Sequence, residues 1–490
     1  MTPEPLTLFS RLRGVAERHG DAPALVDRGR VYSYRQLLDA IEGLAAQVAA
    51  PRRERPGQIA LVCPNGADFV AAFFAILRNG GIVVPLNPAL SEPELTALLG
   101  DAQASKVVTT GPLRDQAAAA LRSACGLGTE AVVTLDRRPP LGGPPPAEVS
   151  PHEPALYLYS SGSTGRPKRV ERSHAGLLYE TDRLVGALGL GPEDRILGVT
   201  PFTHINGLAR SMVAAMLAGA ALVTLPQFER RAVGRAIQEH AISVFIGVPF
   251  MFGMLADTRW PSPVDFSSLR WCISASAPLR PETSRRFRDR YGVYVRQIYG
   301  TTETGTIAVN LDPRVEESLE SVGTPLEGVV VDILAEDGRV LPPGATGEIG
   351  IRSPAAAREY PGLPDETRAA FVGDYFLPGD IGHKDARGRI YLVGRKSLFI
   401  NRAGYKVNPY EVEAVLERHP KVREAAVVGV TTEYGDQKVK AVLVVSEPCP
   451  GHEIVEFCRG KIADFKVPSI VEFRPELPKS AAGKILRAAL

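Results

Sequence analysis

The sequence has few cysteines, and they are not arranged for disulfides or metal binding. Cys63, Cys125, Cys272, Cys449 and Cys458 are odd in number, widely spaced, and include no Cys-x-x-Cys pair. A disulfide framework generally uses an even set of cysteines, and a zinc site uses paired ones. We therefore expect neither, and a reducing cytoplasmic compartment fits best.

The chain also lacks an excess of charge of one sign. It has 57 Lys and Arg residues against 55 Asp and Glu residues, which leaves a net charge of +2 at pH 7. Nucleic acids and anionic membranes attract clustered positive charge, so neither is an expected partner. Any binding of phosphate has to depend on local groups.

Long apolar segments are missing as well. Residues 1–20 mix acidic residues and arginines with apolar ones, and contain no continuous apolar stretch of the signal-peptide kind. The longest uncharged stretch, 211–228, contains Gly219, Thr224 and Pro226. It predicts a buried helix running into a strand rather than a membrane span. We expect a cytoplasmic protein without membrane association.

What remains is an ordinary globular composition, with 44% hydrophobic and 23% charged residues in a chain of 490. At roughly 150 residues per domain, this length allows about three compact units. Strand-like segments at 59–62, 82–85 and 106–110 alternate with helix-like ones, including 68–77 and a helix opened by Ser91 and Glu94 as a capping box. Such βα units predict parallel sheets with helices on both faces.

The pattern changes near Gly394. Asn408 and Glu411 predict the cap of a helix that starts at Pro409, followed by strands at 425–430 and 438–445 and a helix over 453–463. This predicts an α+β unit of about 95 residues that can move separately. The expected fold class is therefore α/β: a large N-terminal unit of several subdomains (1–394), and a small, mobile α+β domain (395–490).

One segment is built for phosphate. Residues 157–168 read YLYSSGSTGRPK, an apolar strand followed by hydroxyls and glycines that end on Arg166 and Lys168. Gly162 and Gly165 let backbone N–H groups turn inward, and Lys168 adds a positive charge. The spacing differs from a Walker A loop, which disfavours P-loop kinase chemistry. The alternative is a flexible Ser/Gly loop without a ligand.

This segment resembles the phosphate loop of the acyl-adenylate-forming superfamily, which includes acyl-CoA synthetases, peptide-synthetase adenylation domains and luciferases. Further motifs follow in the family's order over essentially the whole chain. They are PFTHINGL at 201–208, SASAPL at 274–279, YGTTETG at 299–305, SVGTPL at 321–326, GEIGIRSP at 347–354, PGDIG at 378–382, YLVGRK at 391–396 and PKSAAGKILR at 478–487.

The resemblance implies that a carboxylate attacks the α-phosphorus of ATP, giving acyl-AMP and pyrophosphate. Lys484 is then the mobile lysine that bridges the carboxylate and the α-phosphate. Thr302 is expected to contact the α-phosphate, and Glu303 to anchor Mg²⁺, a hard cation that prefers oxygen ligands. Thr164 is the second candidate for holding the metal or the β- and γ-phosphates. Without the resemblance, Lys484 would be interpreted as an exposed lysine, and Thr302 with Glu303 as part of a turn.

The resemblance also assigns the nucleotide contacts. Asp380 is expected to accept hydrogen bonds from both ribose hydroxyls, a task that suits a carboxylate, and Arg395 to contact the ribose as well. The remaining candidates are the phosphate-loop residues Ser160, Ser161, Gly162, Ser163, Thr164, Gly165 and Lys168, and the adenine-site residues Ser276, Ala277, Pro278, Tyr299, Gly300 and Thr301.

Four residues are candidates for the acid pocket. His204 matches the family's histidine or aromatic residue at its mouth, and Asn206 follows in the same motif. Ile298 stands where many relatives have glycine, and a branched side chain there predicts a short or compact acid, including aryl acids, over a long-chain fatty acid. A buried Arg210 would need an anionic or multi-acceptor partner such as a second carboxylate, although its side chain can equally point elsewhere.

The chain departs from the family pattern in two places. The position about which the small domain rotates, often Asp or Lys, is Ser397, followed by Leu398. Serine does not forbid two backbone states, but it makes thioester formation less secure than adenylation. In addition, Phe202 is followed by Thr203 rather than the aspartate that holds an α-ammonium group, which disfavours ordinary α-amino acids.

The predicted function is an ATP- and Mg²⁺-dependent carboxylic acid ligase that passes the acyl group to a thiol. The thiol is coenzyme A or a carrier-protein phosphopantetheine arm, both entering near Gly404. Other readings are a nitrogen acceptor or an unusual oxyacid, as in specialised metabolism, and an inactive adenylate-binding relative. The sequence does not define the oligomeric state, and a homodimer is an expectation from the family alone.

Overall fold

The computed structural model describes residues 6–48, 57–135, 145–160, 167–402, 405–431, 437–480 and 483–490. By its internal contacts the chain divides into two compact units. The larger comprises 1–162, 166–330 and 351–376, and the smaller 163–165, 331–350 and 377–490. Residues 377–394 thus group with the smaller unit, and a boundary at 394/395 stays a prediction.

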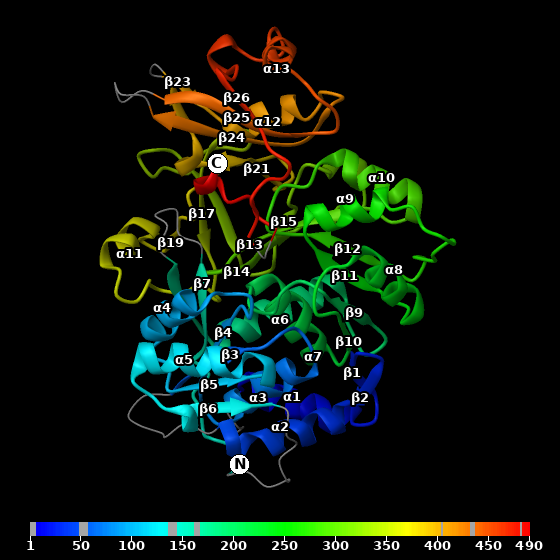
Figure 1. Cartoon of the computed structure of the whole chain (residues 1–490), viewed down its shortest axis with the longest axis vertical. Coiled ribbons are helices and arrows are strands. Elements are labelled where there is room, and N and C mark those ends of the chain that lie inside the picture. The colour runs from blue at the N-terminus through cyan, green and yellow to red at the C-terminus, as the bar shows by residue number, and fades with distance from the viewer. Residues whose placement is uncertain are drawn as a thin grey trace. The chain divides into compact units, whose positions relative to one another are not determined.

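The larger unit contains two mainly parallel sheets, as predicted (Figure 1). The first has the order β6-β5-β3-β4-β7-β8. Its strands are β3 (Gln58–Val62), β4 (Ile82–Leu86), β5 (Lys106–Thr109), β6 (Val132–Thr134), β7 (Pro154–Ser160) and β8 (Lys168–Ser173). β3 is parallel to β4 and β5, and the predicted strands at 59–62, 82–85 and 106–110 are confirmed within a residue at each end.

The second sheet has the order β15-β14-β13-β12-β11-β9-β10-β1-β2. Its strands are β1 (Pro23–Asp27), β2 (Arg30–Ser33), β9 (Arg195–Gly198), β10 (Ala221–Thr224), β11 (Val244–Gly247), β12 (Trp271–Ser274), β13 (Val295–Thr301), β14 (Gly305–Val309) and β15 (Thr324–Pro325). Strands β9, β11, β12 and β13 are mutually parallel neighbours, so their carboxyl ends share one edge of the sheet.

Helices cover both faces of these sheets. α3 (Ala67–Arg78) contacts strands of both sheets, and it is therefore buried along its whole length apart from Ala67 and Asp68. α4 (Glu92–Ala102) and α5 (Arg114–Cys125), blue and cyan in Figure 1, pack through alanines and leucines on the first sheet. α8 (Arg230–Glu239), α9 (Pro249–Asp257) and α10 (Pro281–Tyr291) pack on the second through an aromatic core.

Among the described residues, the larger unit also contains the α-helices α1 (Leu8–His19), α2 (Tyr34–Val48), α6 (His174–Leu188), α7 (Ala214–Ala218) and α11 (Pro364–Ala370), a π-helix over Asn206–Val213, and the short strands β18 (Phe371–Val372) and β19 (Tyr375–Phe376). The predicted capping box of Ser91 and Glu94 is present at α4. The stretch 211–228 is indeed a buried helix followed by a strand, α7 and β10. No helix in the described ranges has both the length and the apolarity to cross a membrane.

The smaller unit is α+β, as predicted. Its strands include all but the first residue of β16 (Val330–Leu334) and all but the last two of β17 (Gly347–Arg352), and the excepted residues group with the larger unit. The others are β20 (Asp380–Lys384), β21 (Ile390–Arg395), β22 (Ile400–Arg402), β23 (Tyr405–Val407), β24 (Val422–Thr431), β25 (Gln437–Val445) and β26 (Ile470–Phe473), and the helices are α12 (Pro409–Leu416) and α13 (Gly451–Cys458). Asn408 caps α12 at the N–H of Tyr410. The helix predicted over 453–463 was placed too late: it ends at Cys458, and Gly460 then adopts a left-handed conformation, φ +72°.

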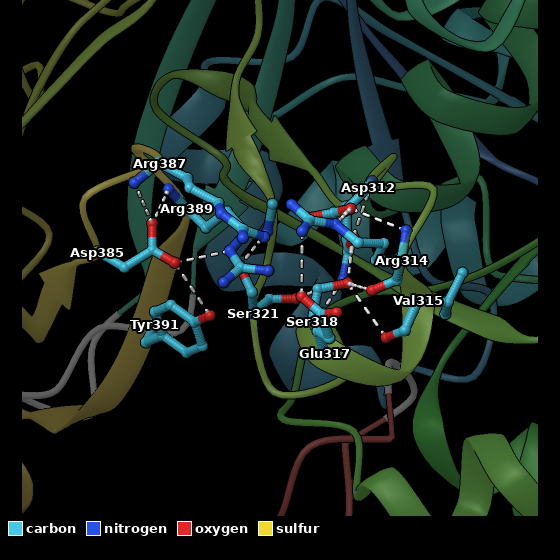
Figure 2. A network of polar contacts seen from close by, with 12 residues as sticks. Asp312, Arg314, Val315, Glu317, Ser318, Ser321, Asp385, Arg387, Arg389 and Tyr391 are labelled. Carbon is cyan, nitrogen blue, oxygen red and sulfur yellow. Dashed lines mark hydrogen bonds and ion pairs between the residues drawn. The ribbon is translucent and has the colours of Figure 1, made fainter.

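Polar side chains hold two connections in place (Figure 2). In the turn between β20 and β21, Asp385 accepts hydrogen bonds from the backbone N–H groups of Arg387 and Arg389, each 2.9 Å. In the segment after β14, Ser318 donates to the carbonyl of Val315 at 3.1 Å. Such local side-chain bonds satisfy backbone groups that the sheets leave unpaired.

Candidate functional site

The carboxyl ends of neighbouring parallel strands bring several predicted site residues to one sheet edge. His204 lies in the segment after β9, Ser276 to Pro278 lie in the segment after β12, and Thr301 ends β13, with Thr302 and Glu303 next. Crevices at the carboxyl ends of such strands are where α/β folds bind ligands. Motifs that are far apart in the sequence therefore lie close together, because the strands that precede them are neighbours in the sheet.

The β13–β14 turn presents Glu303. Thr301 Oγ1 accepts the N–H of Thr304 at 3.1 Å, which closes the turn. The Glu303 residue is only 7% exposed, and its Oε1 accepts a 2.8 Å hydrogen bond from the Tyr360 hydroxyl. Its backbone carbonyl accepts the N–H of Ala357 at 2.7 Å. The carboxylate is thus held in one orientation by a segment some fifty residues later in the chain.

A buried ion pair supports the same turn. Arg172 of β8 donates from Nη1 to the Thr302 carbonyl at 2.9 Å, while its Nη2 lies 3.3 Å from Glu180 Oε2 on α6. Gly305 has φ +71°, and a Cβ there would overlap Glu180 Oε2. The last glycine of YGTTETG is therefore required both by its backbone conformation and by the carboxylate packed against it.

The phosphate-loop candidates are only partly described. Ser161, Gly162, Ser163, Thr164 and Gly165 lie outside the described residues, as does Arg166. The two ends of the loop are described: Ser160 and Lys168 are register partners across β7 and β8. Lys168 Nζ lies 4.8 Å from the centre of the Tyr360 ring. Tyr360 thus contacts both Lys168 and Glu303, which brings these two predicted residues to one aromatic side chain.

The segment predicted to line the adenine site is fixed by hydrogen bonds at both ends. Ala275 N–H donates to the Gly247 carbonyl at 3.0 Å, and Leu279 N–H donates to Gln297 Oε1, also at 3.0 Å. Ser276 between them has φ +72°, a left-handed conformation that costs a non-glycine residue about 1 kcal/mol or more. Strain of this kind is held in place by the surrounding structure, and it is common at ligand sites.

The acid-pocket candidates surround the start of the π-helix. His204 precedes it, Asn206 begins it, and Arg210 lies in its middle. Gly207 packs against the backbone carbonyls of Thr200 and Pro201, which a side chain would overlap. π-Helical turns are rare and occur often at functional sites. Ile298 is buried on β13, in the same strand as Tyr299 and Gly300.

Asp380 and Arg395 meet within the smaller unit. They are register partners across β20 and β21, and Arg395 Nε donates to Asp380 Oδ1 at 2.7 Å. The Asp380 residue is 7% exposed. The structure therefore brings together the two residues that were predicted to contact the ribose.

Lys484 directly precedes Ile485, which forms an antiparallel bridge with Lys479. Ser480 N–H donates to the Lys484 carbonyl at 2.8 Å, and Lys484 itself is exposed. The side chain of Ser397 and all of Gly404 lie outside the described residues, while Leu398 ends a short 3-10 helix.

Comparison with known proteins decides the family. Residues 12–361 match the family model described as "AMP-binding enzyme", and residues 411–484 match "AMP-binding enzyme C-terminal domain". The chain belongs to the AMP-binding enzyme family. The predicted superfamily and fold class are confirmed, and the prediction of an AMP-forming ligase is confirmed at the level of the family.

Curated relatives of this AMP-binding enzyme extend over nearly its whole length. An indoleacetate–CoA ligase of Aromatoleum aromaticum is 34% identical over 475 residues, covering 93% of this chain and 92% of the relative. A fatty acid–acyl-carrier-protein ligase, ScoC, of Streptomyces coeruleorubidus is 30% identical over 504 residues, covering 100% and 96%.

Solved structures agree with this assignment. An ATP-bound chimera, RpMatB-BxBclM B3, superposes with a TM-score of 0.90 at 27% identity, covering 99% of this chain and 97% of the other. The amide bond synthetase McbA from Marinactinospora thermotolerans superposes with a TM-score of 0.86 at 27% identity, covering 98% and 99%. The shared family therefore includes proteins named for thiol and for amide products.

Sequence reasoning missed Tyr360, Arg172 and Glu180. Tyr360 lies outside the quoted motifs, and nothing local distinguishes it from other tyrosines. Arg172 and Glu180 left a weak signal, since an arginine in a β-strand next to a helix that carries a glutamate is a candidate for a buried pair. Only the packing of β8, α6 and β13–β14 shows that both side chains are fully enclosed.

Proposed function

We propose that this AMP-binding enzyme activates a compact carboxylic acid with ATP, forms an acyl-AMP and transfers the acyl group to a thiol. The observation that carries the proposal is the buried, Tyr360-oriented carboxylate of Glu303 beside Thr302 at the carboxyl end of β13. The ends of β9 and β12 at the same edge supply His204 and Ser276.

In this proposal, the site residues position the nucleotide and the acid, and neutralise the charge that builds up during the reaction. In the in-line displacement, negative charge builds on the α-phosphoryl oxygens, so fixed donors and cations dominate the catalysis. In the proposal Thr302 donates to the α-phosphate and Lys484 bridges it to the attacking carboxylate. Asp380, held by Arg395, accepts the ribose hydroxyls, and Ser276 to Pro278 with Tyr299 enclose the adenine.

Magnesium is the proposed metal, because the carboxylate at Glu303 is a hard oxygen donor of the kind that Mg²⁺ prefers. Bound there with nucleotide, Mg²⁺ neutralises charge on the triphosphate. Glu303 supplies the anchoring oxygen, Tyr360 keeps its carboxylate oriented, and Thr164 is the second proposed ligand. A cytoplasmic location fits the absence of disulfide-type cysteine spacing in the sequence.

The test is acid-dependent exchange of labelled pyrophosphate into ATP, run with a panel of acids and with Mg²⁺ withheld or supplied. Exchange requires reversible formation of acyl-AMP, so an enzyme that only binds adenylate gives none. The acceptor is then identified from AMP release with CoA, carrier protein and amines offered in parallel. A folded, ATP-binding enzyme that exchanges with no acid would contradict the proposal.

Two alternative acceptors remain, and each has its own support. A carrier-protein arm is supported by the likeness to ScoC, which is named for such a product. A nitrogen nucleophile is supported by the likeness to McbA and by Ser397 at the pivot position. In the AMP-release assay, turnover with amines but not with thiols would select the second.

A further inference from the structure

The Arg210 guanidinium is enclosed by the protein and only partly satisfied. The residue is 3% exposed, in the middle of the π-helix. Its Nε donates to Thr306 Oγ1 at 3.0 Å, and its Nη1 donates to Asn206 Oδ1 at 3.3 Å. Both acceptors are neutral. Within the described ranges, no carboxylate forms an ion pair with Arg210 and its Nη2 has no acceptor.

The surrounding cluster has an excess of positive charge. Glu180 is the anion that acts on Arg210, but its Oε2 lies 3.3 Å from Arg172 and accepts the Thr306 N–H at 3.1 Å, while its Oε1 has no hydrogen-bond partner among the described residues. Thr306 therefore stands between Glu180 and Arg210, accepting from one side and donating to the other. One carboxylate serves two buried guanidinium groups, which leaves one net positive charge. Burial lowers the pKa of Arg210 to about 10, while Glu180 opposes this shift.

Buried polar atoms without a hydrogen-bond partner among the described residues occur at both ends of this cluster, and those at the Arg172 end are Arg172 Nε, Arg172 Nη2 and Glu180 Oε1. Besides Arg210 Nη2, the amide Nδ2 of Asn206 is buried with no acceptor among the described residues. Asn206 Oδ1 is bonded to Arg210, so the two donor groups belong to adjoining side chains. Gly300 makes the room for Nη2, because a Cβ at that position would overlap it.

A purely structural role explains this arrangement poorly. A buried charge without a counterion is costly, and an unpartnered buried donor adds a further penalty. An arginine that only linked the π-helix to β14 could do so through Thr306 and Asn206 with much less cost if it were exposed or paired. A ligand anion that accepts from Nη2 and Nδ2 would supply both the missing charge and the missing acceptors.

We propose that Arg210 and Asn206 bind a second carboxylate of the organic acid, distal to the carboxylate that is activated. The favoured substrates are then compact dicarboxylic acids, and this inference rests on the proposed adenylation activity. Phosphate is the other anion that the reaction contains, and the measurements below distinguish it from the acid by which Michaelis constant changes. Arg210 and Asn206 contact substrate but take no part in bond making.

The experiment compares matched acids in pyrophosphate exchange with the full chain. Each pair consists of a dicarboxylate and the methyl ketone of the same shape: malonate with acetoacetate, succinate with levulinate, and isophthalate with meta-acetylbenzoate. The variants are Arg210→Met, which removes the charge, and Arg210→Lys, which keeps the charge but removes the fork of donors. Arg235→Met, an exposed arginine on α8, is the matched control.

We expect wild type to prefer at least one dicarboxylate over its ketone by about tenfold or more in kcat/KM. Arg210→Met should abolish this preference by raising the KM for the dicarboxylate, because removing one partner of a buried charge pair typically costs about tenfold or more. Arg210→Lys should lie in between. Arg235→Met should keep the wild-type ratio.

Three results would overturn the inference. One is a wild type that shows no such preference in any pair, which is decisive even where Arg210→Met does not fold. Another is an Arg210→Met enzyme with an unchanged ratio. The last is an Arg210→Met enzyme with a raised KM for ATP instead of for the acid, which would assign the cluster to phosphate. If the enzyme exchanges pyrophosphate with monocarboxylic acids alone, only this inference is wrong. If it exchanges with no acid at all, the proposed function is wrong as well.

Discussion

The Tyr360 hydroxyl donates to Oε1 of Glu303 across 2.8 Å, with both side chains buried. This bond orients the carboxylate that we propose as the metal anchor. Tyr360→Phe removes one hydrogen bond to a charged group, worth about 1.5 kcal/mol, or about tenfold in an equilibrium constant. We expect the Mg²⁺ concentration for half-maximal pyrophosphate exchange to rise by about that factor.

The control for this prediction is Tyr32→Phe, which removes a tyrosine hydroxyl from β2 instead. It should leave the Mg²⁺ dependence unchanged. If Tyr360→Phe also left it unchanged while keeping its fold, Tyr360 would not orient the metal-binding carboxylate.

Lys484 is expected to neutralise the charge that builds up as acyl-AMP forms. Lys484→Ala should slow acid-dependent exchange by about a hundredfold or more, because removing one preorganised electrostatic donor commonly costs that much. Lys479→Ala is the matched control in the same segment, since Lys479 forms an ion pair with Glu424 on β24. A surface pair of this kind contributes little, so the control should retain its activity. Equal activity of both variants would refute the assigned role.

Asp380 is expected to hold the ribose while Arg395 holds Asp380. Asp380→Asn keeps the shape but removes the charge that pairs with Arg395 at 2.7 Å. We expect the KM for ATP to rise by about tenfold to a hundredfold, the cost of a charge-assisted contact, while the KM for the acid stays the same. Asp385→Asn, in the neighbouring turn shown in Figure 2, tests for a merely structural effect. A rise in the KM for ATP in both variants would argue against ribose contact.

Gly305 is expected to be intolerant of a side chain. At φ +71° an alanine costs about 1 kcal/mol, and its Cβ would also overlap the buried Glu180 carboxylate. We expect Gly305→Ala to lower the free energy of unfolding by about 3 kcal/mol or more in urea titration. Gly338→Ala is the control, because Gly338 has φ +82° with nothing near its Cβ position. It should show the conformational cost alone, and equal losses would mean that the Glu180 packing is unimportant.

His174 is expected to make the fold acid-sensitive. It is 1% exposed at the start of α6, and burial lowers its pKa from 6.5 to about 4. Below pH 6.5 the unfolded chain takes up a proton that the folded chain does not, so its contribution is complete above pH 6.5 and is lost as the pH falls toward 4. At pH 5 the loss is about 2 kcal/mol.

This prediction is checked by urea unfolding of wild type and His174→Gln at pH 7.5 and pH 5. The variant should lose less stability between the two pH values than wild type does, by about 2 kcal/mol. His152→Gln, in the segment before β7, is the control and should retain the wild-type difference. A variant with the wild-type pH dependence would contradict the assignment.

From the sequence alone, the family, the fold class and several of the elements could be predicted. Hydrophobic period, caps and glycines are local properties, so β3, β4 and the capping box of α4 could be predicted from neighbouring residues alone. The prediction failed where one residue's conformation decided the outcome, as at Gly460 beyond the end of α13. The motif residues were identified from the sequence, and each was assigned an expected chemical role.

Which of these residues contact one another became clear from the folded chain alone. Tyr360 hydrogen-bonds to Glu303, which lies 57 residues away in the sequence. Thr306 links Arg210 to Glu180, and Thr306 and Glu180 are separated by 126 residues. Such contacts depend on strand order and on helix packing, which no local pattern encodes. For the same reason the charge imbalance around Arg210 could not be read from the chain: burial and pairing are properties of the folded neighbourhood, while the sequence shows only that an arginine is present.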